Sequence, residues 1–285
     1  MSEYPVRTDL ALEAREKVQE KQPDLRGVRV EEEFLKDTEI QVTKVIVESK
    51  NGAKELGKPM GTYITLEAPN MTEPDDNYHR EISKELAKQM KELLPRENNM
   101  SVLVVGLGNR EVTPDALGPN VINNMMITRH LIKEFGKAAY EEEKANLISG
   151  IVPGVMAQTG METAEILRGV IKETKPDLVI AVDALAARST KRLNRTIQIT
   201  NTGIHPGSGV GNYRNAITEE SLGVPVIAIG IPTVVDAATI VNDAMENMLS
   251  AQATLNNMFV TPKDVDENVK RLGYTISEAL NIALS

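Results

Sequence analysis

The chain of 285 residues contains no cysteine and no tryptophan, and only 3% of its residues are aromatic. The lack of cysteine excludes disulfides, thiolate nucleophiles and cysteine-ligated metals. The few aromatic residues disfavour a surface on which nucleic-acid bases stack. The chain also lacks an apolar run approaching the roughly 18 residues of a membrane span, and its N-terminus lacks the apolar core of a secretion signal. We therefore expect an intracellular globular protein with an aliphatic core and no membrane partner.

The charge balance is acidic, with 41 Asp and Glu residues against 32 Lys and Arg residues and a net charge of −9. An acidic surface repels phosphate backbones, so we expect no direct binding to nucleic acid. The length favours one large α/β domain over several small ones.

Apolar runs alternate with helical patterns along most of the chain. Val102–Val105, Leu178–Val182 and Val224–Ile231 are predicted to be buried strands, because their apolar residues serve both faces of a covered sheet. Apolar residues at helical spacing predict helices at Asp76–Leu94, Leu117–Phe135, Met161–Lys175, Val235–Leu249 and Lys263–Leu284. The pattern predicts a three-layer α/β sandwich with a mainly parallel, twisted sheet.

The N-terminal part of the chain has a different pattern. Residues 1 to about 25 are polar and are predicted to form a peripheral arm. Ile40–Glu48 and Gly61–Ala68 are predicted strands, and Asn51-Gly52 between them favours a hairpin turn. We assign a small β subdomain to about residues 27–75.

Two aspartates that follow apolar strands are the main candidates for catalysis. Asp115 comes after the strand that stops at Gly106 and Gly108, and Asp183 directly follows the run LVIAV. Carboxyl ends of neighbouring parallel strands lie at one edge of a sheet. Two carboxylates in one cleft can share a proton, which leaves one base to activate water and one acid to protonate a leaving group. Each aspartate could instead cap the helix that follows it.

Other motifs offer weaker alternatives. The turn GLGNRE favours a nucleotide-cofactor site of a Rossmann-like oxidoreductase, but Glu111 stands where the third glycine of G-x-G-x-x-G is expected. His205 and Ser208 lie close together in sequence, yet no G-x-S-x-G elbow exposes a serine nucleophile. Three scattered histidines form no zinc motif. A non-enzymatic oligomeric scaffold is the remaining alternative.

Several blocks of the sequence closely resemble the spore germination protease family of endospore-forming bacteria. These blocks are GLGNREVTPDALGP (106–119), PGVMAQTGMET (153–163), KPDLVIAVDALAAR (175–188), QITNTGIHPGSGVGN (198–212) and GVPVIAIGIPTVVDA (223–237). The resemblance covers most of residues 4 to 243 and resumes at VTPKDVD (260–266). It implies an α/β fold similar to that of the hydrogenase-maturation proteases.

The resemblance also implies an activity. It indicates an endopeptidase of the spore core that degrades small acid-soluble spore proteins when germination begins, made as a zymogen and working as a homotetramer without a cofactor. The two essential aspartates of the family fall on Asp115 and Asp183. No histidine-rich ligand set accompanies them, so we expect no metal. Candidates for the substrate cleft are Asn109, His205 and Ser208.

The family cuts its substrates after an acidic residue and before a large apolar residue followed by Ala. The chain carries this pattern itself at Arg7-Thr8-Asp9-Leu10-Ala11. The resemblance therefore predicts self-processing at Asp9-Leu10, with residues 1–9 as a propeptide and residues 10–285 as a single peptidase domain.

Overall fold

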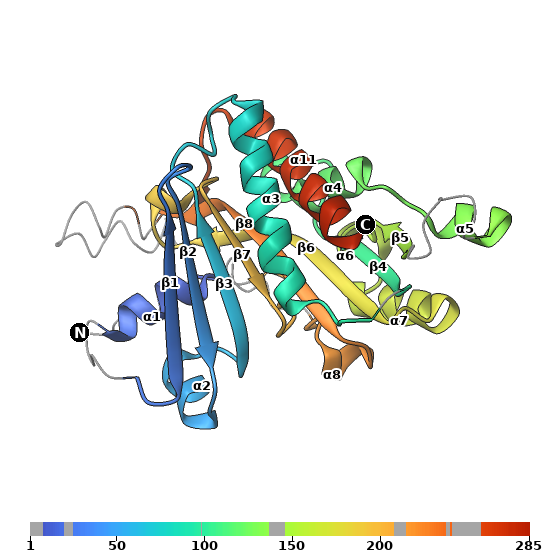
Figure 1. Ribbon diagram of the computed structural model, residues 1–285, viewed down its shortest axis with the longest axis horizontal. Coiled ribbons are helices and arrows are strands. Elements are labelled where there is room, and N and C mark those ends of the chain that lie inside the picture. The colour runs from blue at the N-terminus through green and yellow to red at the C-terminus, as the bar shows by residue number, and fades with distance from the viewer. Residues whose placement is uncertain are drawn as a thin grey trace.

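The structure, a computed structural model, describes residues 8–19, 25–97, 99–136, 146–207, 215–237, 240 and 258–285. Within this part of the chain one nine-stranded sheet has the order β1-β2-β3-β7-β8-β6-β4-β5, with β9 beside β8 (Figure 1). The strands are β1 Val28–Leu35, β2 Ile40–Val47, β3 Gly61–Glu67, β4 Ser101–Gly106, β5 Leu147–Ile151, β6 Leu178–Ala187, β7 Thr196–Thr200, β8 Val226–Asp236 and β9 Phe259–Val260. None of the helices in these ranges is long and apolar enough to cross a bilayer.

The sheet has a parallel half and an antiparallel half. Strands β8, β6, β4 and β5 run parallel to one another, while β7, β3, β2 and β1 continue the sheet from β8 with antiparallel pairing, and β9 pairs antiparallel with β8. The predicted buried strands correspond to β4, β6 and β8, and the predicted α/β class is confirmed. The N-terminal strands are continuous with this sheet, because β3 pairs with β7.

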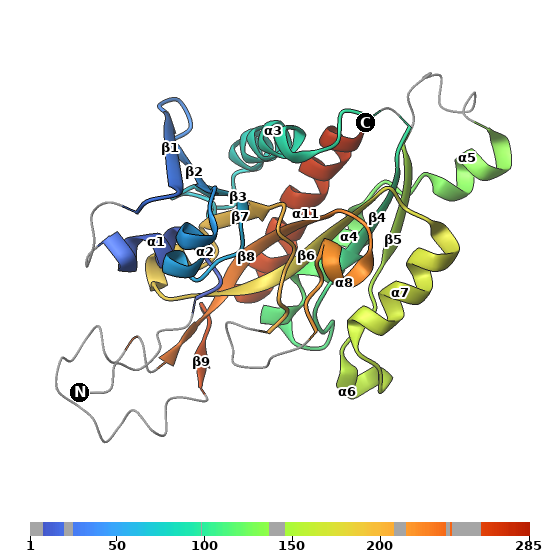
Figure 2. The ribbon, with the colours of Figure 1, turned by 90° about the horizontal axis from the view of Figure 1, so that it is seen from below.

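Helices cover both faces of the sheet and make three layers. The described helices are α1 Ala11–Gln19, α2 Lys50–Leu56, α3 Asp76–Leu93, α4 Leu117–Asn124, α5 Arg129–Phe135, α6 Met156–Thr159, α7 Thr163–Thr174, α8 Glu219–Leu222 and α11 Val265–Leu284. Helices α3, α4 and α11 share the large apolar core on one face, and Figures 1 and 2 show α3 and α11 side by side. Helices α7 and α8 pack on the opposite face of the sheet, against the parallel strands. Helices α1 and α2 pack on that same face, against β2 and β3.

Two predictions about the N-terminal region are wrong. Asn51-Gly52 lies inside α2 rather than in a hairpin turn, because Ser49 caps this helix by accepting a hydrogen bond from the Gly52 N–H. Residues 8–19 form no peripheral arm, since Leu10, Ala11 and Leu12 are buried. The apolar face of this short segment outweighs its polar composition.

Further differences concern the ends of elements. The predicted helix Leu117–Phe135 is two helices, α4 and α5, and the sequence analysis did not predict strand β5. Strand β6 runs to Ala187, so Asp183 lies within the strand and not at its end. Residues 235 and 236 belong to β8, and most of the predicted helix 235–249 lies outside the described residues.

Two glycines allow α4 to approach the parallel strands closely. A Cβ at Gly118 would lie 2.4 Å from the Leu107 carbonyl oxygen and 2.6 Å from that of Val182, and a Cβ at Gly106 would lie 2.3 Å from the Gly118 oxygen. Real contacts are never so short, so a side chain there would displace backbone. This approach fixes the start of α4, and with it the position of the preceding turn that carries Asp115.

Gly118→Ala is therefore expected to lower the free energy of unfolding by about 1–3 kcal/mol, as overpacking does, and to reduce proteolytic activity by displacing that turn. The matched control is Gly169→Ala in α7, where an added Cβ meets nothing within 4 Å. Alanine is the better helix former, so the control should gain up to about 1 kcal/mol. Chemical denaturation of both variants measures the two effects. Equal stability of Gly118→Ala and the unmodified chain would contradict the close-packing argument.

Candidate active site

Asp115 and Asp183 line one cavity of about 480 Å³. Asp183 is 5% exposed. The cavity wall combines residues from the turn after β4, the end of β6, the end of β8, the start of α7 and the segment around β9. Two carboxyl groups far apart in sequence thus line the same cavity, although their catalytic role stays a prediction.

The position of Asp115 is set by the turn that follows β4. Asp115 ends a short 3-10 helix, Thr113–Asp115, and its Oδ2 accepts a hydrogen bond of 2.8 Å from the Asn109 N–H. Gly108 has a φ of 107°, and a Cβ there would lie 1.9 Å from the Asp115 carbonyl oxygen, so this turn requires glycine. Thr233 of β8 donates a 2.7 Å hydrogen bond to the Pro114 carbonyl. Asp115 is not the cap of α4, since that helix begins after Ala116.

The position of Asp183 follows from the alternation of side chains along β6. Val182 packs into the core beneath α4 and α11, so Asp183 projects from the opposite face. Asp183 pairs in register with Gly230 of β8, which in turn pairs with Gln198 of β7. One row across three strands therefore presents a carboxylate, a glycine and an amide on the same face.

The chain's own segment Asp9–Ala11 is bound on this face. The Asp9 N–H donates to the Ala186 carbonyl at 3.0 Å, and the Ala186 N–H donates to Oδ2 of Asp9 at 2.9 Å. Leu10 is 0% exposed in an apolar cluster with Leu185, Ala187, Leu193 and Val235. Asp9 also lines the cavity that contains Asp115 and Asp183. The predicted cleavage sequence thus lies beside the two predicted catalytic aspartates.

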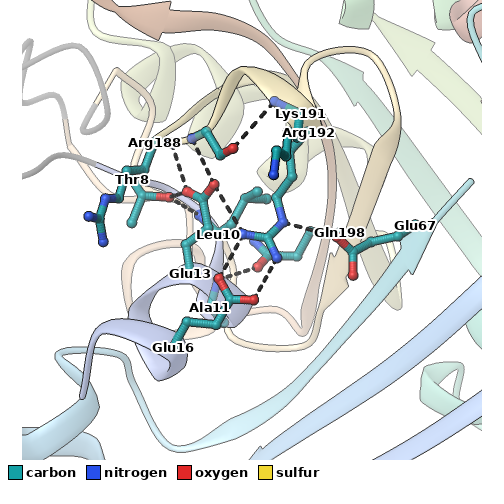
Figure 3. A network of polar contacts seen from close by, with 11 residues as sticks. Thr8, Leu10, Ala11, Glu13, Glu16, Glu67, Arg188, Lys191, Arg192 and Gln198 are labelled. Atoms are coloured by element: carbon teal, nitrogen blue, oxygen red, sulfur yellow. Dashed lines mark hydrogen bonds and ion pairs between the residues drawn. The ribbon is translucent and has the colours of Figure 1, made fainter. Parts of the chain in front are cut away.

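A buried acid fixes the register of this segment (Figure 3). Glu13 is 2% exposed and accepts hydrogen bonds from the Arg188 N–H at 2.7 Å, the Ser189 N–H at 3.1 Å and the Arg192 guanidinium at 3.4 Å. The hydroxyl of Thr8 also donates to Glu13. Burial opposes the charge on Arg192, but its contacts with Glu16 and Glu67 outweigh burial and raise its pKa above the ordinary value. The anchoring of Glu13 places Leu10 in its apolar cluster.

The three candidates for the substrate cleft differ in their positions. Asn109 does not line the large cavity, but its N–H holds Asp115 and its side-chain oxygen accepts from Gln158 at 3.0 Å. His205 lines a second, smaller cavity of about 70 Å³ together with Asp9. Ser208 lies outside the described residues.

Lys58 and Gln198, which contact Asp9, were not among the candidates predicted from sequence. Lys58 belongs to the polar stretch after α2, and Gln198 is one polar residue in a short strand, so neither forms part of a motif. Their contact partner, Asp9, lies 49 residues from Lys58 and 189 residues from Gln198 in the sequence. Lys58 and Gln198 are identified as site residues only because residues 9–11 dock against them in the structure.

A metal site is not formed by the described side chains, which include no group of three His, Cys, Asp or Glu residues that could hold an ion. His79, one of the three histidines, joins α3 to α11 by a 2.8 Å contact with the Thr275 hydroxyl. Burial lowers its pKa. This histidine has a structural role.

Comparison with known proteins agrees with the sequence blocks. A family model described as germination protease, peptidase A25, matches residues 6–254. A germination protease from Caldanaerobacter subterraneus subsp. tengcongensis is 46% identical, with 98% of this chain and 94% of that protein covered. A germination protease from Clostridium tetani is also 46% identical, with 98% and 95% covered, and one from Bacillus mycoides is 46% identical, with 87% and 68% covered.

Among solved structures, a NiFe hydrogenase maturation protease, HycI from Thermococcus kodakarensis, is similar over 67% of this chain and 98% of its own, with 18% identity and a TM-score of 0.35. The family model covers well over half of the chain, and the relatives cover almost all of it. The chain belongs to the germination protease family and is a peptidase.

Proposed function

We propose that this germination protease is an endopeptidase that degrades small acid-soluble spore proteins in the spore core when germination begins, with Asp115 and Asp183 as its acid–base pair. The observation that carries the proposal is the single cavity lined by both aspartates and by Asp9 of the chain's own cleavage sequence. The resemblance to the family further supports a zymogen and a homotetramer.

The chemistry requires one ionised and one protonated carboxyl group. The ionised group takes a proton from water as the water attacks the carbonyl carbon, and the protonated group donates a proton to the leaving nitrogen. Two carboxyl groups that line one cavity can share a proton in this way. The two residues have different supports, a glycine turn for Asp115 and a strand for Asp183.

The N-terminal segment supports a self-processing zymogen. The bond between Asp9 and Leu10 lies in the cavity region, held by the two hydrogen bonds between Asp9 and the main chain of Ala186 and by the buried Leu10. Cleavage there would release residues 1–9 as a propeptide and leave residues 10–285 as the peptidase domain. The buried residues Leu10, Ala11 and Leu12 would stay with the mature chain.

The direct test is incubation of the protein with a purified small acid-soluble spore protein, followed by mass spectrometry of the fragments. We expect a cut after an acidic residue and before a large apolar residue followed by Ala, as at Asp9-Leu10-Ala11. A small acid-soluble spore protein that stays intact, or is cut at unrelated positions, would contradict the proposed substrate.

Proteolysis is expected to withstand a strong chelator, because two carboxyl groups can supply both proton transfers without a metal. The measurement is the rate of peptide cleavage before and after dialysis against the chelator, and we expect the two rates to agree within about twofold, a margin far below the effect of losing one general acid or base. A fall in activity that one divalent metal reverses would instead identify a metal site. His205, in the adjoining small cavity, would then be a candidate ligand.

A further inference from the structure

The carbonyl oxygen of Asp9 is bound by two side-chain donors. Nζ of Lys58 lies 2.9 Å from this oxygen, and Nε2 of Gln198 lies 3.3 Å from it. The oxygen belongs to the peptide bond between Asp9 and Leu10, which is the bond predicted to be cut. Both donors therefore contact a reacting atom of the proposed self-processing reaction.

Neither donor is a flexible surface group that happens to be near. Gly57 ends α2 with a φ of 68°, and the N–H groups of Gly57 and Lys58 both donate to the Ala53 carbonyl. These bonds fix the backbone from which the Lys58 side chain extends. Gln198 is buried in the middle of β7, and its Oε1 accepts a 2.7 Å hydrogen bond from the Ala11 N–H. That bond orients the amide so that its NH2 group faces Asp9.

The two donors and the two carboxyl groups approach Asp9 from different sides. Lys58 and Gln198 line the small cavity, whereas Asp115 and Asp183 line the large one, and Asp9 borders both. A water molecule in the large cavity could attack the carbonyl carbon while the oxygen remains bound in the small one. This arrangement separates activation of the water from stabilisation of the oxygen.

The charge of the small cavity suits a developing anion. Burial lowers the pKa of Lys58 below its ordinary value, and the acids Asp9 and Glu13 oppose this shift. A cation in a partly buried site interacts with negative charge more strongly than in bulk water. The electrostatic interaction between Lys58 and the carbonyl oxygen is therefore strongest when that oxygen becomes an oxyanion.

We propose that Lys58 and Gln198 form the carbonyl-binding pair of this peptidase and stabilise the oxyanion that forms on the acidic residue preceding the cut bond. The assignment rests on the proposed function and extends it from Asp9 to the corresponding residue of a protein substrate. Lys58 supplies the charge, and Gln198 supplies a second hydrogen bond while its other end holds the N–H two residues beyond Asp9. Both are catalytic residues because both touch the reacting oxygen.

The reaction balances with these groups in place. Water adds to the carbonyl carbon of Asp9 and gives a proton to the ionised carboxylate, while the π electrons of the C=O bond move to the oxygen held by Lys58 and Gln198. The C=O bond then re-forms as the C–N bond breaks, and the nitrogen of Leu10 takes a proton from the protonated carboxyl group. The products are a carboxyl group on Asp9 and an amine on Leu10.

The test compares Lys58→Met, Lys58→Arg and the unmodified chain. Lys54→Met is the matched control, since Lys54 is an exposed lysine of α2. The first readout is the rate at which the full chain acquires an N-terminus at Leu10. The second is kcat and KM of the matured protein on a peptide with the sequence PVRTDLALEARE of residues 5–16.

Lys58→Met is expected to slow both reactions about 100-fold or more, the usual loss on removing one oxyanion donor, with the effect in kcat and KM changed only a few-fold. Lys58→Arg should recover at least about a tenth of the rate, because the cation is restored, and Lys54→Met should match the unmodified chain. Melting curves verify that each variant is folded, and Lys58→Arg provides the test if Lys58→Met unfolds.

The outcomes separate two failures. If the unmodified chain cuts and Lys58→Met cuts as fast, or changes KM alone, the carbonyl-binding assignment is wrong while the peptidase proposal stands. If Lys58→Arg is as slow as Lys58→Met, the charge is not what acts, and the assignment again fails. If the unmodified chain cuts neither its own bond nor the peptide, the proposed function itself fails, and the assignment with it.

Discussion

Asp115→Asn and Asp183→Asn are each expected to reduce peptide cleavage by about a thousandfold or more while leaving the chain folded. General acid or base catalysis by one group contributes about 10²–10⁴-fold, and here each aspartate would perform one of two linked proton transfers. An amide of nearly equal size preserves packing in the cavity wall but can neither accept nor release the proton. The measurement is kcat/KM on a small acid-soluble spore protein, with circular dichroism and melting curves to verify the fold.

The two variants are expected to fail for the same reason, so the double variant should be little slower than either single one. Groups that act as a unit show this kind of non-additivity. Asp37→Asn is the matched control, because Asp37 is an exposed aspartate in the turn between β1 and β2. Near-normal turnover in either Asp115→Asn or Asp183→Asn would exclude the acid–base pair.

The parallel core could be predicted from sequence because its strands are apolar on both faces. Val102–Val105 and Leu178–Val182 contain few residues that suit any other environment, and both lie in adjacent parallel strands as expected. The position of Asp115 after a glycine turn was also visible, since Gly106 and Gly108 interrupt the apolar run. Binary patterning is most informative where burial is complete on both sides.

The remaining errors arise where tertiary contacts override local signals. Asn51-Gly52 favours a turn locally, but the cap by Ser49 and the burial of Leu56 against β2 and β3 stabilise a helix there. Strand β6 continues beyond Asp183 because β8 is long enough to pair with it as far as Ala187. Local sequence contains no information about the length of a neighbouring strand.

Burial of the N-terminal segment, residues 8–19, also depends on tertiary contacts. The composition of residues 8–19 predicts a solvated arm. In the structure, however, Glu13 accepts hydrogen bonds from two main-chain N–H groups and from an arginine in the loop after β6. A buried acid is stable only with such partners. The site residues Lys58 and Gln198 could not be predicted for the same reason, because their ligand is a segment distant in sequence.

Self-processing is expected to produce a single new N-terminus at Leu10 and to require both aspartates. The bond between Asp9 and Leu10 already lies beside the cavity that contains Asp115 and Asp183, so no large movement is needed to bring them together. Acidification from neutral to mildly acid pH should accelerate the cut, since Asp115 and Asp183 border one cavity and the reaction requires one of these two groups to hold a proton. N-terminal sequencing at several pH values measures both the position and the rate.

A substitution at Leu10 tests whether docking of this residue is needed for the cut. Leu10→Asp is expected to slow the cut at least about 100-fold, because burying an unpaired carboxylate among apolar side chains costs several kcal/mol and releases the segment from β6. Lys17→Ala in the last turn of α1, outside the apolar cluster, is the control and should be processed normally. A chain cut equally fast with Leu10→Asp would show that docking does not select the bond. The same cut in Asp183→Asn would point to an outside protease.

The cut should also change what the site can bind. A charged amine on Leu10 would be formed inside an apolar cluster, where burial of a charge is unfavourable. The new terminus is therefore expected to leave the cluster formed with Leu185, Leu193 and Val235, which frees the same subsites for a protein substrate. Activity on a small acid-soluble spore protein should then rise in step with the appearance of the Leu10 terminus, and full activity of the uncut chain would contradict this order. Maturation in this scheme converts a segment bound at the site into an open site without rebuilding the sheet.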